Sequence, residues 1–260
     1  MAQSIALKNY FNEDLAHHLS TLIVAHHPSF PANSFIRSVE KQVTPLELKG
    51  RVAVISQALR EHLPHEYPVA LSILLNILGP ENETEEGMFT NGYFLMPVAH
   101  FVEVYGLNDQ HQSLHALYEI TKRHTSEYAI RPYITNSPDQ TYIVLQRWLT
   151  DSNSHVRRLV SEGTRPRLPW AKKINVIKND VTNHFHLLEP LLNDPSPYVR
   201  KSVANHINDL SKSHTEQTVN WLETIINGDK PYHHKIVQHG LRTLIKQKND
   251  KALDFLNKLM

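Results

Sequence analysis

The chain has 260 residues, of which 40% are hydrophobic, 15 are Pro, 8 are Gly and none is Cys. This length suffices for one large domain or two small ones with a sizeable buried core. The absence of Cys excludes disulfides, cysteine-ligated zinc, iron–sulfur clusters and thiol catalysis. No run approaches the roughly 18 apolar residues of a membrane span, and the N-terminus lacks the apolar core of a signal peptide. The glycines form no dinucleotide or phosphate-loop motif, so no cofactor is expected.

The net charge of +1 conceals an uneven distribution of charge. Residues 1–110 contain 6 Lys and Arg against 12 Asp and Glu, whereas residues 111–260 contain 21 against 14. The segment 147–173 has seven cations, five of them Arg, and two acids. A basic half indicates a polyanionic partner, most simply nucleic acid, and Arg suits phosphate well. The alternative is a solvated basic surface, and charge alone does not separate the two.

Apolar residues recur at three- to four-residue spacing through most of the chain, which predicts an all-α fold. The expected helices cover 12–26, 44–63, 66–78, 93–105, 110–122, 139–149, 196–210, 215–226 and 232–246. Thr44 is expected as the N-cap of its helix, with Pro45 at the first position and Glu47 completing a capping box. Residues 79–92 are acidic and rich in Gly, which predicts an exposed loop.

Two segments repeat at an offset of 43 residues: WLTDSNSHVRRLV (148–160) and LLNDPSPYVRKSV (191–203). The matched positions include Asp151 with Asp194, Arg157 with Arg200, and Arg158 with Lys201. A weaker third copy, INGDKPYHHKIV, contains Asp229. Paired helices with a period near 40 residues predict a HEAT-like α-solenoid of stacked antiparallel helix pairs. The basic pairs recur at one point of each unit, so we expect them to line a basic concave cleft.

The segment SEGTRPRLPW (161–170) combines two Arg, two Pro and a Trp, which is unusual for a linker. A short helix is expected to end there, with Gly163 as its left-handed stop, and Pro169 is expected to open the next helix. Glu162 then lies at a helix C-terminus, where the macrodipole disfavours an anion by about 0.3–1 kcal/mol. The alternative to a functional acid is a surface carboxylate held by Arg158.

Other candidate residues give weaker signals. Asp209 lies in the last turn of its helix, again unfavourable for an anion, and a solvated helix end is the alternative. Glu127 begins an expected helix over 127–134, where a carboxylate is favoured, so by itself it would be structural. The 18 histidines include no HExxH arrangement and no evident third ligand, and we expect no metal site. No GxSxG motif supports Ser-His-Asp catalysis.

The segments SEGTRPRLPWAKKI (161–174) and TKRHTSEYAIRPY (121–133) together resemble the AlkC branch of the bacterial HEAT-like DNA alkylation-repair glycosylases. NILGPE, GMFTNGYFLMPVAHFVEVYG and the Asp-x-x-x-x-Val-Arg repeats are similar to that family's layout. The resemblance implies helix pairs that cup duplex DNA and excise cationic alkylated bases such as 3-methyladenine and 3-methylcytosine. It implies a cytoplasmic bacterial enzyme, and no membrane partner is expected. Whether the damaged base is flipped stays open.

The resemblance implies the catalytic residues Glu162, Glu127 and Asp209. The residues expected to bind substrate or DNA are Trp170, Arg165, Arg167, Arg131, Arg158, Arg157, Arg200 and Lys201. Methylation at N3 leaves a cationic base that is already a good leaving group. A carboxylate near C1′ that stabilises the oxocarbenium-like charge and orients a water would then help most. No Lys in the two segments is placed for Schiff-base chemistry, which predicts a monofunctional enzyme that leaves an abasic site.

We expect residues 1–260 to form one HEAT-like domain, with acidic N-terminal helices over 1–110 and basic DNA-binding repeats over 111–260, acting as a monomer. Some family members carry an immunoglobulin-like domain after the repeats. This sequence stops at Met260 on an expected helix, so we expect that module to be absent. Two alternatives are a HEAT-type scaffold that binds nucleic acid or protein without chemistry, and a relative that only senses alkylated DNA.

Overall fold

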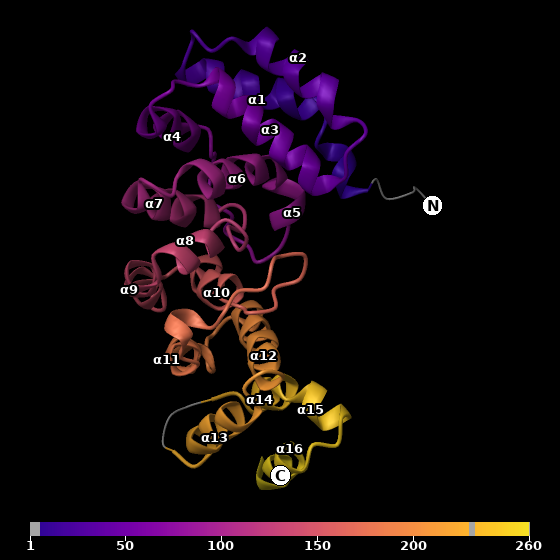
Figure 1. Cartoon of the computed structure of the whole chain (residues 1–260), viewed down its shortest axis with the longest axis vertical. Helices are drawn as coiled ribbons and strands as arrows, with labels where there is room; N and C mark the ends of the chain where they lie inside the picture. The colour runs from indigo at the N-terminus through magenta and orange to yellow at the C-terminus, as the bar shows by residue number, and fades with distance from the viewer. Residues whose placement is uncertain (1–5, 229–231, 260) are drawn as a thin grey trace. The chain divides into compact units, whose positions relative to one another are not determined.

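The structure is a computed structural model that describes residues 6–228 and 232–259. Every element in these ranges is an α-helix or a short 3₁₀ helix, which confirms the predicted all-α fold (Figure 1). The chain divides into two compact units, Met1–Ile130 and Arg131–Met260. This division falls after Ile130 and not at the change in charge near residue 110. No helix in the described ranges has the length and apolar character needed to cross a membrane.

The first unit is built from helices that pack both on sequence neighbours and on helices farther along the chain. They are α1 (Glu13–His26), α2 (Ala32–Val43), α3 (Leu48–His62), α4 (Tyr67–Asn76), α5 (Met88–Asn91), α6 (Met96–Tyr105) and α7 (Gln110–Thr121), with 3₁₀ helices at Leu7–Tyr10 and Tyr93–Leu95. The pairs α1–α2, α2–α3, α3–α6, α4–α7 and α6–α7 are in contact. Leu19, Ile55 and Phe101 are fully buried among them, as the periodic apolar stripes require.

The turn between α2 and α3 differs from the predicted one. Thr44 follows α2 with helical backbone angles, and α3 begins at Leu48 with Glu47 as its N-cap residue. The buried Arg51 donates to the carbonyl oxygens of Thr44 at 3.0 Å and of Leu46 at 2.7 Å. The predicted capping box at Thr44 and Glu47 is therefore wrong, because an N-cap residue has extended and not helical backbone angles. Glu47 makes no capping hydrogen bond, and its carboxylate accepts from Lys8 Nζ at 2.6 Å instead.

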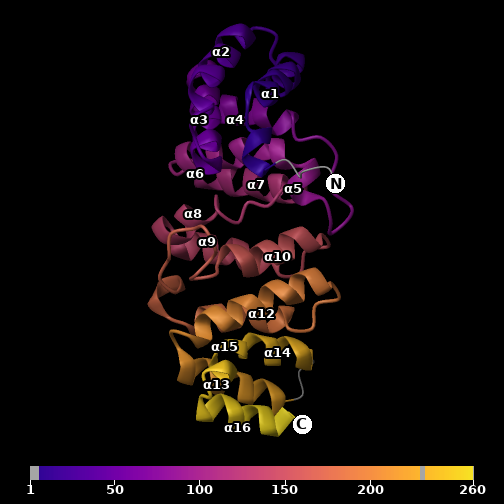
Figure 2. The same ribbon diagram turned by 90° about the vertical axis from the view of Figure 1, so that its right-hand side faces the viewer.

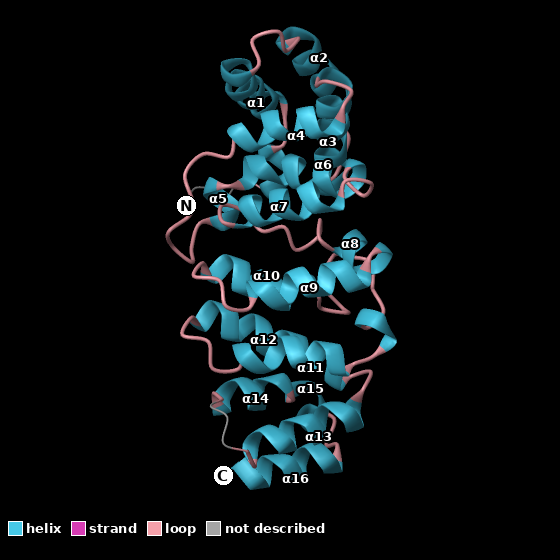
Figure 3. Cartoon of the chain, turned by 90° about the vertical axis from the view of Figure 1, so that its left-hand side faces the viewer, coloured by secondary structure: helices cyan, strands magenta, loops and turns pink. Residues whose placement is uncertain are grey.

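The second unit stacks its helices in pairs. They are α8 (Arg131–Asn136), α9 (Pro138–Trp148), α10 (Ser154–Gly163), α11 (Thr182–Leu188), α12 (Pro197–Ser211), α13 (Thr215–Ile226), α14 (His234–Gly240), α15 (Arg242–Lys246) and α16 (Asp250–Leu259), with 3₁₀ helices at Ile177–Asn179 and Glu189–Leu191. The helices α10, α12 and α14 pack one against the next (Figure 2). Seen from the opposite side, α9, α11 and α13 form the second row (Figure 3). This arrangement is the predicted HEAT-like stack of helix pairs.

The end of α10 also departs from the prediction. The helix ends at Gly163, but Gly163 does not have a positive φ. No helix starts at Pro169, because residues 165–176 form an irregular loop, which we call the Trp170 loop. The buried Arg131 donates to the carbonyl oxygens of Gly163, Arg165 and Lys172 at 3.1, 2.7 and 2.7 Å. One guanidinium thus replaces the expected glycine stop and holds both limbs of the loop.

Three other boundaries differ. The predicted loop 79–92 includes the one-turn helix α5, and the helix predicted to start at Glu127 begins only at Arg131. The single helix predicted over 232–246 is divided into α14 and α15 at Leu241. Asp229 of the third repeat copy lies outside the described residues.

Close packing of α14 on α12 yields a test of the fold. A Cβ at Gly240 would lie 2.5 Å from Cγ2 and 2.8 Å from Cβ of Ile207. We therefore expect Gly240→Ala to lower the free energy of unfolding by about 1–3 kcal/mol, as measured by urea denaturation. In an Ile207→Ala background, which removes the nearest atom, the loss should be smaller. Equal losses in the two backgrounds would contradict this close approach.

Candidate active site

Two acids from successive repeats meet around one guanidinium in the second unit. Arg165 donates from Nη1 to Oε1 of Glu162 at 2.6 Å and from Nε to Oδ2 of Asp209 at 2.9 Å. Glu162, Arg165 and Asp209 are only 6%, 7% and 3% exposed. Glu162 lies at the end of α10 and Asp209 in the last turn of α12, so the packing of these helices brings the acids together. Two of the three predicted catalytic acids therefore share one place.

The charges in this cluster are balanced mainly by Arg165. Burial by itself would lower the pKa of Arg165, but the Glu162 and Asp209 carboxylates more than offset it, and the pKa of Arg165 is raised. Other cations are farther away, with Arg158 Nη2 3.8 Å from Glu162 Oε2 and Lys212 Nζ 3.8 Å from Asp209 Oδ1. Arg158 is thus a secondary partner of Glu162.

Arg165 also explains why both acids tolerate helix C-termini. The helix macrodipole disfavours each by about 0.3–1 kcal/mol. A buried charge without its partner is far more costly, about 3–5 kcal/mol when one member of a buried pair is removed. Because the ion pairs are the larger effect, the positions of Glu162 and Asp209 need no bound cation to explain them.

A group of buried polar side chains next to Glu162 escaped the sequence patterns. Ser202 Oγ lies 2.6 Å from Glu162 Oε2, and His206 Nδ1 lies 2.9 Å from the carbonyl oxygen of Ser161. His206 Nε2 lies 3.0 Å from His184 Nδ1. The available signal was the spacing of Ser202, His206 and Asp209, which places three polar residues on one face of α12.

Trp170 is presented by the irregular loop that begins at Arg165. It is 78% exposed and has a φ of 61°, an uncommon conformation for a bulky side chain. Such strain costs on the order of 1–3 kcal/mol and persists only where the surroundings impose it. Arg131 binds both limbs of the loop, and Ile174 N–H donates to the carbonyl oxygen of Pro166 at 3.3 Å. The loop therefore holds a large apolar surface outward.

Three of the arginines predicted to bind DNA are engaged in hydrogen bonds within the protein. Arg131 is buried against the carbonyl groups of the Trp170 loop, as described above. Arg157 donates to Oδ2 and Oδ1 of Asp194 at 2.6 and 3.0 Å and to the carbonyl oxygens of the turn at 151 and 152. Arg200, one repeat later, donates to the carbonyl oxygens at 194 and 195. The expectation that the repeated arginines face outward is therefore corrected, because each folds back over its own Asp-containing turn.

Other cations remain accessible. Arg167 and Lys201 are exposed, and Arg167 donates to Ser213 Oγ at 3.1 Å. Arg242, which lies outside the repeat alignment, donates to Asn205 Oδ1 at 3.0 Å. Burial lowers the pKa of Arg242, and the charges of Asp209 and Arg165 also act on it, in opposite directions. Arg242 is thus a cation beside the acids that sequence patterns did not identify.

Glu127 is a buried acid of the first unit. It is buried in the turn that precedes α8, and its Oε2 accepts a hydrogen bond from Thr125 Oγ1 at 3.0 Å. Thr125 Oγ1 also accepts from the backbone N–H of Glu127 at 3.2 Å. The residue is therefore a buried, oriented carboxylate and not a solvated helix start.

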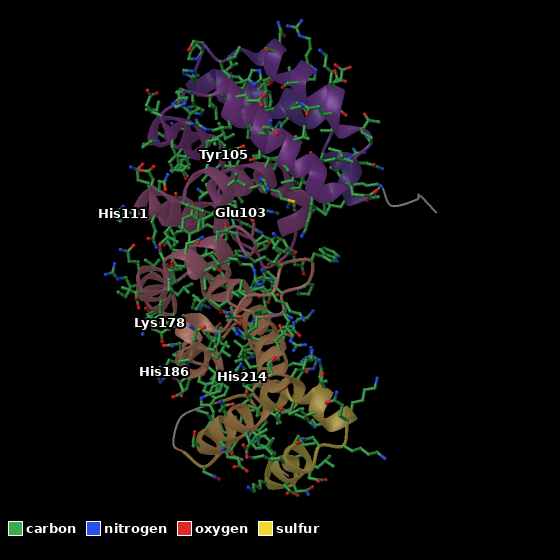
Figure 4. The ribbon with its side chains drawn as sticks, in the orientation of Figure 1. Glu103, Tyr105, His111, Lys178, His186 and His214 are labelled. Atoms are coloured by element: carbon green, nitrogen blue, oxygen red, sulfur yellow. The ribbon has the colours of Figure 1, made fainter. Side chains whose placement is uncertain are left out.

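Two histidines of α11, His184 and His186, differ in exposure. His184 is buried against His206, whereas His186 is exposed on α11 (Figure 4). In the part of the chain that the structure describes, no three His, Asp or Glu side chains are grouped to hold a metal ion.

Comparisons with known proteins identify the family of the chain. A family model described as DNA alkylation repair enzyme matches residues 123–258, a span that includes Glu127, the Trp170 loop and Asp209. The chain belongs to this family. It is an AlkC-type member, similar to the Pseudomonas fluorescens alkylpurine DNA glycosylase AlkC, solved bound to DNA containing an abasic site analog. The two share 34% identity with a TM-score of 0.84, over 98% of this chain and 69% of that one.

A second relative is the uncharacterized protein YhaZ of Bacillus subtilis (strain 168). It is 39% identical over 209 residues, which are 80% of this chain and 56% of the relative. The chain therefore spans little more than half the length of this curated relative.

The buried histidine pair predicts a pH dependence of stability. Burial, with a smaller effect of His214 (Figure 4), lowers the pKa of His184 to about 3, and burial with nearby charges holds the pKa of His206 well below its ordinary 6.5. Unfolding therefore takes up protons below about pH 6.5. This contribution is fully present above that pH and is lost towards pH 3, at up to about 1.4 kcal/mol per pH unit for each histidine.

Urea denaturation between pH 7.5 and 4.5 measures this slope. His206→Asn should make the slope shallower, because one buried titratable ring is gone. His186→Asn, which removes an exposed ring from the same unit, should leave the slope as in the wild type. A wild-type slope that His206→Asn does not change would contradict the assignment.

Proposed function

We propose that the protein is a DNA glycosylase that hydrolyses the N-glycosidic bond of cationic alkylated bases in duplex DNA. The proposed substrates are 3-methyladenine and 3-methylcytosine, and the product is an abasic site. The observation that supports this most is the buried Glu162–Arg165–Asp209 cluster at the base of the exposed Trp170 loop. It lies within the span matched by the family model, and its AlkC relative was solved on abasic-site DNA.

The cluster has the carboxylate oxygens that such a reaction needs. Placed close to C1′, they would favour a cationic base and the oxocarbenium-like sugar of the transition state over neutral nucleotides. Arg165, with Arg158 and Lys212 at 3.8 Å, offsets their total charge, so this effect depends on which atoms lie nearest the sugar and not on the net charge. A carboxylate has about four acceptor positions, and Glu162 uses one on each oxygen for Arg165 and Ser202. Each Glu162 oxygen keeps an acceptor position with which to orient water or face C1′.

The roles of the acids follow from their settings. Glu162 and Asp209 are held by Arg165, so we assign Arg165 to positioning them and not to phosphate. Glu127, which lies in the matched span, is proposed as a third acid. Lys212 Nζ lies 3.8 Å from Asp209 Oδ1, so we assign this Lys to balancing the carboxylate and propose direct hydrolysis without a Schiff base.

DNA would be held by the accessible cations and by Trp170. Arg167 and Lys201 are exposed and Arg158 is half-buried beside Glu162. Arg side chains fit phosphate oxygens, and such contacts fix the position of a duplex without reading its sequence. Trp170 offers an apolar ring for packing on a sugar or base. Action on chromosomal DNA would place the protein in the bacterial cytoplasm, and we propose that it acts as a monomer.

One observation favours the alternative of a binding protein without chemistry. Glu162 and Asp209 are almost fully buried and already paired with Arg165, as purely structural acids would be. The two proposals differ in one respect, the release of a free base.

The first test incubates the full chain with methylated duplex DNA and separates released bases by chromatography. We expect free 3-methyladenine and 3-methylcytosine from the wild type. Glu162→Gln should lower release by about 100-fold or more while DNA binding persists, because it removes transition-state charge stabilisation. Glu216→Gln, at an exposed acid of α13, is the matched control and should match the wild type. No release at stoichiometric enzyme would refute the glycosylase and favour the binding protein.

The second test separates cations that face solvent from cations that close the fold. Each phosphate contact that is lost should reduce the slope of log K against log salt by about 0.9. We expect this reduction for Arg167→Ala and Lys201→Ala in titrations with duplex DNA. Arg157→Ala, whose guanidinium holds Asp194, should lower stability and leave the slope unchanged. A smaller slope for Arg157→Ala, with unchanged slopes for Arg167→Ala and Lys201→Ala, would instead place the DNA contact at the Asp-containing turns.

A further inference from the structure

The face of α12 that packs on α10 is polar where an apolar seam would be ordinary. Ser202, His206 and Asp209 follow at spacings of four and three residues, and all are buried. Each reaches the last turn of α10 or the residues just after it: Ser202 the side chain of Glu162, His206 the Ser161 carbonyl, and Asp209 the guanidinium of Arg165. Buried polar groups are tolerated when all are satisfied, and here one side of the contact is the proposed catalytic acid itself.

The histidines form a hydrogen-bonded chain with a fixed direction. The backbone N–H of Ile177 donates to His184 Nε2 at 3.0 Å, so His184 must carry its proton on Nδ1. That proton points to His206 Nε2 at 3.0 Å, which leaves the His206 proton on Nδ1. His206 Nδ1 then donates to the carbonyl oxygen of Ser161 at 2.9 Å. The backbone at both ends sets both tautomers, and both rings are 0% exposed.

A second, shorter chain ends on the carboxylate of Glu162. Ser202 Oγ is 3.0 Å from Ser161 Oγ and 2.6 Å from Glu162 Oε2. A hydroxyl has one proton, and the charged acceptor is the stronger one, so Ser202 donates to Glu162 and accepts from Ser161. With Arg165 on Oε1, both oxygens of Glu162 are directed by a hydrogen bond, one from α12 and one from the residue three positions later.

We propose that Ser202 and His206 are positioning residues for Glu162. Ser202 acts on the carboxylate and His206 on the preceding Ser161 carbonyl. His184 fixes the tautomer of His206 and ties Ile177, just after the Trp170 loop, to the same helix end. The inference rests on the proposed glycosylase function, since it assigns the support of that site.

The hydrogen-bonded chain has a spectroscopic signature that is independent of activity. In water the Nε2–H tautomer of neutral histidine is the more common one, so two buried Nδ1–H rings stand out. Long-range proton–nitrogen correlation spectra of the full chain at pH 7.5 should show Nδ1–H for both residues. The signals are assigned by their loss in His184→Asn and His206→Asn. An Nε2–H tautomer or a doubly protonated ring at either position would contradict this hydrogen-bonded arrangement of the two histidines.

The positioning role is tested by single-turnover release of 3-methyladenine beside DNA affinity. Ser202→Ala should slow release about tenfold with DNA affinity unchanged, because a hydrogen bond to a charged group is lost. Ser211→Ala is the matched control: it is buried on the same helix, but its Oγ donates to the Asn208 carbonyl. It should release base at the wild-type rate. A purely structural role for Ser202 would lower stability in both variants and leave the rate with Ser202→Ala unchanged.

For His206 two variants separate positioning from misfolding. The Nδ2 of His206→Asn can take the place of Nδ1 and still donate to Ser161, whereas His206→Leu cannot. Release should therefore fall further with His206→Leu than with His206→Asn; equal rates would overturn the role of the Ser161 bond. A wild type that releases no base refutes the proposed function itself. An active wild type with an equally active Ser202→Ala refutes only the positioning role.

Discussion

The arrangement of the second unit depends on one buried guanidinium. Arg165 links the acid that closes α10 to the acid in the last turn of α12, and it begins the loop that exposes Trp170. Three nearly buried charges are stable only together, because any one left alone would face a low-dielectric surrounding without its counterion. The relative register of α10 and α12 is thereby set to within hydrogen-bond reach. A non-polar contact would tolerate slippage that this one does not.

Placing a site on such a seam has a thermodynamic consequence. Replacing a buried ion pair with well-packed apolar side chains is often neutral or stabilising, so the polar face of α12 is not the arrangement that maximises stability. Its neighbours on the same helix, Val199, Val203 and Ile207, are fully buried and supply the apolar packing instead. Helix α12 therefore has one stripe that holds charges against α10 and a separate apolar stripe, of which Ile207 packs on Gly240 of α14.

Sequence patterns predicted the helices and the 43-residue repeat and marked the unusual helix-end positions of Glu162 and Asp209, because periodicity and helix-end position are local properties. The catalytic role of the two acids came from the family resemblance and stays a prediction. The patterns did not predict what binds those acids. Arg165 and Arg167 look alike in SEGTRPRLPW, yet one is buried and the other exposed. The structural role of Arg131 could not be predicted for a related reason. Its acceptors are backbone carbonyl groups, which every residue has, so no residue type marks them. The pairing of His184 with His206 required knowledge of two helices at once, and the Glu47 carboxylate expected in a capping box is instead paired with Lys8, 39 residues away in the sequence.

The Asp-containing turns link one repeat of the second unit to the next. Arg157 closes the turn at Asp151 of its own repeat and also pairs with Asp194 of the next repeat. The turn at Asp194 is closed by Arg200. Arg157 thus has two roles at once, since it closes its own turn and reaches the next repeat, whereas Arg200 bonds only to the carbonyl groups of its own turn in the contacts given above. The Arg157–Asp194 pair couples these two repeats energetically, in the nearest-neighbour manner of solenoids. Loss of order in the first repeat would remove the cation that pairs with Asp194 in the second, so this one ion pair favours cooperative unfolding of the two.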